Sequence, residues 1–104
     1  MTRVTIRDEK DRAGIDMVGH ANHDGPGGDI VCAACSVLIQ ALANALYVQD
    51  VRMKWSQKSG EAHVEFEAGR TLHRDLKARG AFEMCCMGLE MLAQSYPKNV
   101  TIEK

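Results

Sequence analysis

The sequence lacks the features that place a protein in a membrane, outside the cell or on a nucleic acid. Residues 1–10 contain no apolar core of the kind a secretory signal needs, and no apolar run approaches the length that spans a bilayer. A basic excess is also missing, since 13 Lys and Arg stand against 14 Asp and Glu, a net charge of -1. Binders of nucleic acid or anionic membranes usually carry such an excess. We therefore expect a cytoplasmic protein with no nucleic-acid or membrane partner.

The chain also lacks internal repeats, linkers and low-complexity tails, and its 104 residues suit one compact domain spanning 1–104. Its four cysteines do not indicate a disulfide scaffold. Small secreted disulfide domains follow signal peptides and are poor in core residues, whereas this chain is 45% hydrophobic. Cys85 and Cys86 are adjacent, a geometry that rarely forms a structural bridge. We expect reduced thiols.

Apolar residues alternate with polar ones in some segments and recur every three or four residues in others. These patterns predict strands at 3–7, 15–18, 51–56, 61–67 and 100–102, and helices at 29–48 and 72–96. Strands with one apolar face fit a mostly antiparallel sheet that helices cover on that face. The expected fold is α+β, a two-layer sandwich of about five strands with both helices packed on one side.

The same periodicity predicts which residues are buried. For the first helix these are Val31, Ala34, Cys35, Leu38, Ala41, Leu42, Ala45 and Leu46. For the second they are Leu72, Leu76, Phe82, Cys85, Leu89, Leu92 and Tyr96. Trp55 shares the apolar face of the hairpin and is expected in the core. Gly80 is expected to break or bend the second helix.

Cys32 and His20 are the residues most suggestive of chemistry. If Asp29 is the N-cap, Cys32 is the third helical residue, where the helix dipole and free amides favour a thiolate. The glycine-rich loop 22–28 could fold this helix start back beside His20, which ends a strand. That arrangement suits a nucleophile and its base. By position alone, however, a small core cysteine and a structural histidine are the commoner interpretation.

A longer pattern favours the catalytic interpretation. Gly19-His20-Ala21, a loop, and then Gly28-Asp29-Ile30-Val31-Cys32-Ala33-Ala34-x-Ser36 resemble the signature of the ribosomal-processing cysteine proteases called Prp. The resemblance covers essentially the whole chain. It implies a small homodimeric α/β protease that needs no cofactor or metal. It also implies the substrate, because this family removes the N-terminal extension of large-subunit ribosomal protein number twenty-seven.

The resemblance also assigns roles to residues. It makes Cys32 the nucleophile and His20 the general base, with Gly19 and Ala21 beside the base. Asp29 matches the acid of the motif, which either caps the helix or orients His20. Ser36 lies one turn after Cys32, so its hydroxyl either hydrogen-bonds near the thiol or bonds back to the Cys32 carbonyl.

The loop between the two motifs is expected to cover the site. Its residues Asn22, His23, Gly25, Gly27 and Gly28 form a candidate substrate loop, in which glycines permit unusual backbone angles. A simple connection with no gating role is an equally open interpretation.

Other functions remain possible from spacing alone. Cys32-Ala-Ala-Cys35 has the spacing of a thiol redox pair, and with His20 and His23 it could form a zinc site. Against both, Cys35 falls on the apolar stripe of its helix, where the family more often has valine. A non-catalytic ribosome-associated binding module would need neither His20 nor Cys32.

The remaining cysteines and histidines are expected to be structural. Cys85 and Cys86 lie between Met84 and Met87, a cluster that suits core or dimer packing. His63 and His73 are expected in exposed polar positions.

Overall fold

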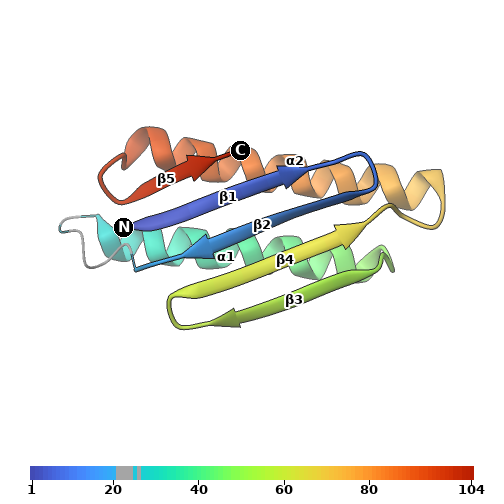
Figure 1. The fold of residues 1–104 in the computed structure, drawn as a ribbon, viewed down its shortest axis with the longest axis horizontal. Helices are drawn as coiled ribbons and strands as arrows, with labels where there is room; N and C mark the ends of the chain where they lie inside the picture. The colour runs from blue at the N-terminus through green and yellow to red at the C-terminus, as the bar shows by residue number, and fades with distance from the viewer. Residues whose placement is uncertain (21–24, 26) are drawn as a thin grey trace.

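The computed structural model describes residues 1–20, 25 and 27–104, which form a sheet layer and a helix layer (Figure 1). The strands are β1 Thr2–Asp8, β2 Arg12–Val18, β3 Met53–Lys58, β4 Glu61–Glu67 and β5 Val100–Glu103. The helices are α1 Gly28–Val48 and α2 Leu72–Ser95. Both helices lie on one side of the sheet, so the predicted two-layer α+β fold and its order of elements are confirmed.

The sheet is mixed, with the strand order β3-β4-β2-β1-β5. Neighbouring strands are antiparallel except for β1 and β5, which pair in parallel with Thr2 opposite Val100. The parallel pair arises because α2 carries the chain back along the sheet before β5 begins, as parallel pairing requires. β3 and β5 are therefore the two edge strands.

β2 is longer than its sequence pattern indicated. It begins at Arg12 rather than Ile15, because Ala13 and Gly14 continue the ladder opposite Phe66 and Glu65. These small residues carry little hydrophobic signal, yet both are buried in the sheet.

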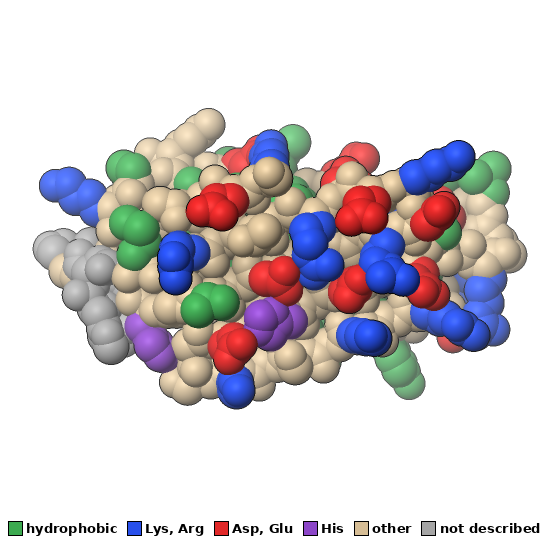
Figure 2. All heavy atoms as spheres, in the orientation of Figure 1, with side chains coloured by type: hydrophobic (Ala, Val, Ile, Leu, Met, Phe, Trp, Pro, Cys, Tyr) green, Lys and Arg blue, Asp and Glu red, His purple; other side chains and the backbone are tan. Residues whose placement is uncertain are grey.

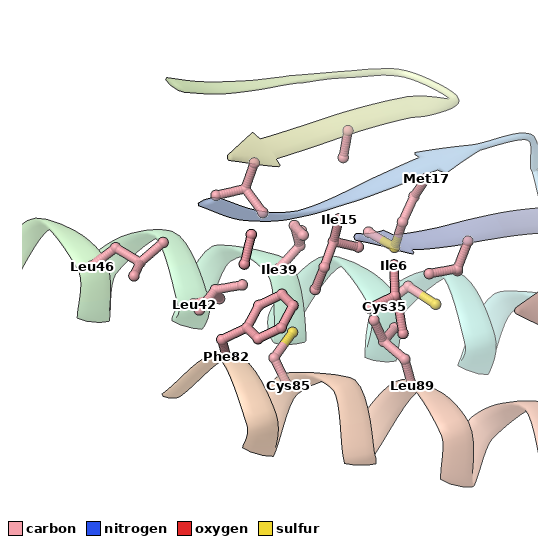
Figure 3. Packing of buried hydrophobic residues seen from close by; sticks show 14 of the residues in the cluster. Ile6, Ile15, Met17, Cys35, Ile39, Leu42, Leu46, Phe82, Cys85 and Leu89 are labelled. Carbon is pink, nitrogen blue, oxygen red and sulfur yellow. The ribbon is translucent and has the colours of Figure 1, made fainter. Parts of the chain in front are cut away.

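The core fills the space between the sheet and the two helices (Figure 3). Phe66 of β4 and Phe82 of α2 meet edge to face, with 5.5 Å between ring centroids. The fully buried residues of α1 and α2 are Val31, Ile39, Leu46, Ala78 and Leu89. Ile39 was absent from the predicted stripe, while Ala41 is exposed. The buried residues of α1 follow one another at intervals of four, four, three and four residues from Val31 to Leu46. This spacing includes position 39 and does not include position 41.

Three other expectations about burial were wrong. Leu72 and Leu76 are 72% and 60% exposed because the first turns of α2 project past the ends of the strands (Figure 1). Trp55 is 39% exposed because β3 is an edge strand with no described neighbour beyond it. Gly80 does not break α2, which is one continuous helix through that residue.

α1 is long and apolar enough, by length and composition alone, to cross a membrane, contrary to the expectation from the sequence. One such helix is weak evidence, since the core helix of a soluble protein has the same properties. The buried stripe of α1 packs on the sheet, and its Leu38 packs against α2. A Cβ added at Gly88 would lie 2.9 Å from Leu38 Cδ2, so glycine permits this close approach of the helices.

Candidate active site

His20 follows β2 through a glycine-dependent turn. Gly19 has φ +112, a left-handed conformation that favours glycine, and a Cβ there would overlap with the Met1 carbonyl oxygen. The Gly19 amide donates to the Gly60 carbonyl at 2.9 Å, which ties this turn to the tip of the β3–β4 hairpin. The glycine beside the candidate base is therefore there for backbone geometry.

The hairpin tip also meets the His20 ring directly. Gly60 has φ +78, and a Cβ at this position would overlap with His20 Nε2 and lie 3.0 Å from Cε1. The backbone at Gly60 therefore lies against the His20 imidazole, and a side chain at this position would clash with the ring. This contact was not predicted from the sequence, in which Gly60 lies between the two strands expected at 51–56 and 61–67.

Cys32 lies near the start of α1, two residues further into the helix than expected. The N-cap is Gly27, with φ 90 and no side-chain capping bond, so the predicted capping role of Asp29 was wrong. Asp29 is the second helical residue and Cys32 the fifth. Because Cα–Cβ bonds of a helix tilt toward its N-terminus, the Cys32 thiol still leans over the first turn.

Two backbone amides in the first turn of α1 donate to no other residue that the structure describes. Gly28 donates its amide to Gly25 at 3.1 Å, and Val31 donates to Gly27 at 3.0 Å, the first regular helical bond. The amides of Asp29 and Ile30 have no helical acceptor, as at any helix start. Asp29 is exposed and forms no side-chain hydrogen bond or ion pair with another described residue, so its carboxylate adds negative charge near the positive helix end.

One pocket unites the two candidate catalytic residues. It has a volume of about 370 Å³ and lies between the end of the sheet and the first half of α1. His20 and Cys32 both line it, as do Ser36 and Cys35. Its other walls come from β1, β2 and the hairpin, through Thr2, Met17, Gly19, Gln57, Lys58, Ser59, Gly60, Glu61 and Ala62.

Part of the predicted substrate loop falls outside the residues that the structure describes. Ala21, Asn22 and His23 lie outside the described residues. Gly25 and Gly27 both adopt positive φ, whereas Gly28 is buried as the first residue of α1 and so belongs to the helix. A Cβ at Gly27 would lie 2.9 Å from Tyr96 Cδ1, which makes this glycine a packing requirement for the helix start.

Cys35 behaves as a core residue. It is 5% exposed, and burial, together with the nearby Cys32, raises the pKa of its thiol to about 11. A thiol with so high a pKa stays protonated near neutral pH, which is unfavourable for redox exchange. Among the described residues, no group of three or more His, Cys, Asp or Glu side chains could hold a metal ion.

The other two cysteines pack between the layers. All four thiols are free. Cys85 is buried and its Sγ lies 3.5 Å from the Leu38 carbonyl oxygen, and burial raises its pKa to about 12. Cys86 is half-buried against the core, with its pKa raised to about 11 mainly by burial. These positions agree with the packing role predicted for them.

His63 is more engaged than an exposed polar residue. Acidic and basic side chains gather on the face of the sheet that the helices leave uncovered (Figure 2). On that face the Nδ1 of His63 lies 2.8 Å from Asp16 Oδ1, and its Nε2 lies 2.8 Å from Glu61 Oε1. Hydrogen bonds to Asp16 and then Glu61 raise the pKa of His63, and the bond to His63 lowers the pKa of Glu61. Glu61 also lines the pocket, so its hydrogen bond to His63 holds one of the pocket-lining side chains in place.

Comparison with known proteins points to one family. A family model described as cysteine protease Prp matches residues 1–101. The ribosomal processing cysteine protease Prp of Bacillus subtilis is 26% identical over 107 residues, covering 98% of this chain and 96% of that protein. The crystal structure of SMU.848 from Streptococcus mutans is 30% identical with a TM-score of 0.73, covering 99% and 92% of the two chains.

A further structure shares the fold. The ribosomal processing protease Prp from S. aureus, crystallised with a substrate peptide, has a TM-score of 0.77 at 21% identity, covering 99% of this chain and 98% of that one.

Proposed function

Because this chain belongs to the Prp family of ribosomal-processing cysteine proteases, we propose that it removes the N-terminal extension of large-subunit ribosomal protein number twenty-seven, with Cys32 as nucleophile and His20 as general base. One observation carries the assignment of residues: His20 and Cys32 come from different elements and line the same pocket. We also propose a cytoplasmic location, which is where a ribosomal protein would be processed and which the four free thiols support.

The chemistry follows from the positions of the groups. His20 takes the Cys32 proton, and the thiolate attacks the scissile carbonyl carbon to form a tetrahedral intermediate. The amides of Asp29 and Ile30, in the first turn of α1, would donate hydrogen bonds that stabilise the oxyanion. His20 then gives its proton to the leaving amine, and water hydrolyses the thioester to release the second product.

The remaining pocket residues position these two groups. Gly19 turns the chain after β2, and Gly60 supports the far edge of the His20 ring. Ser36, half-buried one turn after Cys32, lines the pocket floor beside the nucleophile. Because Asp29 is exposed, its part is electrostatic, at the end of α1, rather than a hydrogen bond that holds His20.

Substitution of the two reactive groups tests the assignment. Cys32→Ala, Cys32→Ser and His20→Ala should each lower cleavage of a peptide spanning the processing site by at least about a thousandfold. Their circular dichroism and thermal unfolding should stay close to those of the unmodified protein. Cys86→Ser is the matched control, since Cys86 lies outside the pocket and should retain full activity. Undiminished cleavage by Cys32→Ala rejects the mechanism.

The substrate is tested separately. Incubation with the purified precursor of the organism's own ribosomal protein should release one N-terminal peptide, identified by mass spectrometry. A precursor sequence with no N-terminal extension would overturn the substrate while leaving the protease chemistry in place.

The chain should act as a homodimer through the outer face of its helices. Val37, Met87 and Met91 are 65%, 63% and 61% exposed there, and Val37 and Met91 flank an apolar groove between α1 and α2. Exposed apolar surface of this kind marks association sites. Sedimentation should show a dimer, and Met91→Glu should shift it toward monomer without unfolding the chain. A monomer at all concentrations contradicts this.

A further inference from the structure

The open edge of β3 lies beside the pocket and has no part in the mechanism proposed above. β3 is an outermost strand, and its residues from Lys54 to Lys58 are all exposed. No described strand pairs with its second edge. An exposed edge presents backbone donors and acceptors that can bind another extended chain.

The hydrogen bonds of the hairpin show which backbone groups face outward. In an antiparallel pair, residues bonded to the partner strand alternate with residues whose amides and carbonyls point away. The Glu67 amide donates to the Arg52 carbonyl at 2.9 Å, which fixes the phase. Every second residue after Arg52 bonds to β4 in the same way, and Ser56 and Lys58 belong to this set. Trp55 and Gln57 therefore direct their amides and carbonyls to the open edge.

This edge leads directly to the nucleophile. Gln57 and Lys58, at the end of β3, line the pocket that contains Cys32. Gln40 of α1 donates from Nε2 to Gln57 Oε1 at 3.1 Å, so the helix and strand are linked at that level. Cys32, Ser36 and Gln40 are spaced by four residues and share one face of α1, which runs along the strands (Figure 1).

The distance along the sheet from the level of Gln57 to the Cys32 thiol follows from the geometry of the helix and the strand. Eight helical residues between Gln40 and Cys32 span about 12 Å. An extended chain rises about 3.3 Å per residue, so about four residues bridge from the level of Gln57 to the thiol.

We propose that the substrate binds as an added strand on the open edge of β3, pairing with the backbones of Trp55 and Gln57 about four residues from the scissile bond. The occupant is an extended peptide because the edge is continuous with the cleavage pocket. The exposed Trp55 side chain, on the helix-facing side of the sheet, gives an apolar contact for alternate peptide side chains. This inference rests on the proposed function, since it places the substrate of that same site.

Amide hydrogen exchange tests the pairing without catalysis. Cys32→Ala protein, measured by NMR, receives a saturating peptide that spans the processing site. The amides of Trp55 and Gln57 should exchange at least about tenfold more slowly. Those of Ser56 and Lys58, already bonded to β4, serve as internal controls and should not change. Bound peptide with unaltered exchange at Trp55 and Gln57 overturns the proposal. So does protection at both amides before peptide is added, which would show that a second copy occupies the edge.

A matched pair of variants gives a second measurement. Trp55→Pro removes an outward amide without removing a bond to β4, while Trp55→Val keeps that amide and removes the indole. Trp55→Pro should raise KM about fivefold above that of Trp55→Val, with kcat of the two within twofold. Equal KM values overturn the added strand. Failure of the unmodified protein to cleave the peptide at all would instead reject the proposed function, so the two failures are distinguishable.

Discussion

The substitution Gly60→Ala tests whether the hairpin tip positions the catalytic base. Gly60 is left-handed, with φ +78, and alanine in that conformation costs about 1–2 kcal/mol. The added methyl group would also overlap with His20 Nε2 and crowd Cε1 at 3.0 Å. To restore ordinary van der Waals separation, the ring must retreat by about 1 Å.

A displacement of that size has a large catalytic effect. Misplacing a reacting group by about 1 Å lowers rates about a hundredfold. We therefore expect kcat/KM of Gly60→Ala to fall about a hundredfold, and the free energy of unfolding by about 1–2 kcal/mol. Cleavage of a fluorogenic peptide gives the first quantity and urea unfolding gives the second.

Gly80→Ala provides the matched control. A Cβ at Gly80 meets no atom within 4 Å, and the residue lies inside α2. Alanine there should raise the free energy of unfolding by up to about 1 kcal/mol and leave kcat/KM unchanged. If Gly60→Ala, shown to be folded by circular dichroism, loses stability as expected but cleaves within twofold of the unmodified protein, then the hairpin tip does not position His20.

Two further perturbations have definite expected outcomes. His63 has a raised pKa, so its bonds to Asp16 and Glu61 stabilise the fold below its unfolded pKa of about 6.5 and lose that effect as pH rises through the raised value. Urea unfolding should therefore show His63→Gln less stable than the unmodified protein at pH 6 and equal to it at pH 9. A difference that persists at pH 9 contradicts the role of the charge. Cys35→Val should keep the free energy of unfolding within about 1.5 kcal/mol and retain full cleavage, because it fills a buried site with an apolar group. Loss of cleavage in that folded variant would indicate that the Cys35 thiol takes part in the reaction.

The fold could be predicted from the sequence wherever local periodicity decides the structure. Both helices and all five strands follow from apolar spacing, which reports the side of an element that must be buried. Trp55, Leu72 and Leu76 were misjudged for the opposite reason. They have the correct spacing, but their burial depends on whether another element covers them. An edge strand and a projecting helix end are decided only by the assembled layers.

The reactive groups of the site could be predicted from the sequence, but the residues that position those groups could not. His20 and Cys32 stand out because few residue types perform this chemistry. Gly60 matters because its lack of a side chain leaves space for the His20 ring. The two residues are forty positions apart in the sequence, so no local pattern predicts their contact. The cap of α1 was misassigned for a related reason. A carboxylate at Asp29 suggested capping by a side chain, whereas Gly27 begins the helix through its backbone conformation.

The pairing of β1 with β5 has a consequence for when one wall of the pocket is supported during folding. Thr2, which forms part of the pocket wall, donates its amide to the carbonyl of the buried Asn99 at 2.9 Å and lies opposite Val100. Contacts between residues so distant along the chain form late in folding. Support of this pocket wall therefore comes late in folding, when the last strand pairs with the first, although none of the described residues of β5 lines the pocket.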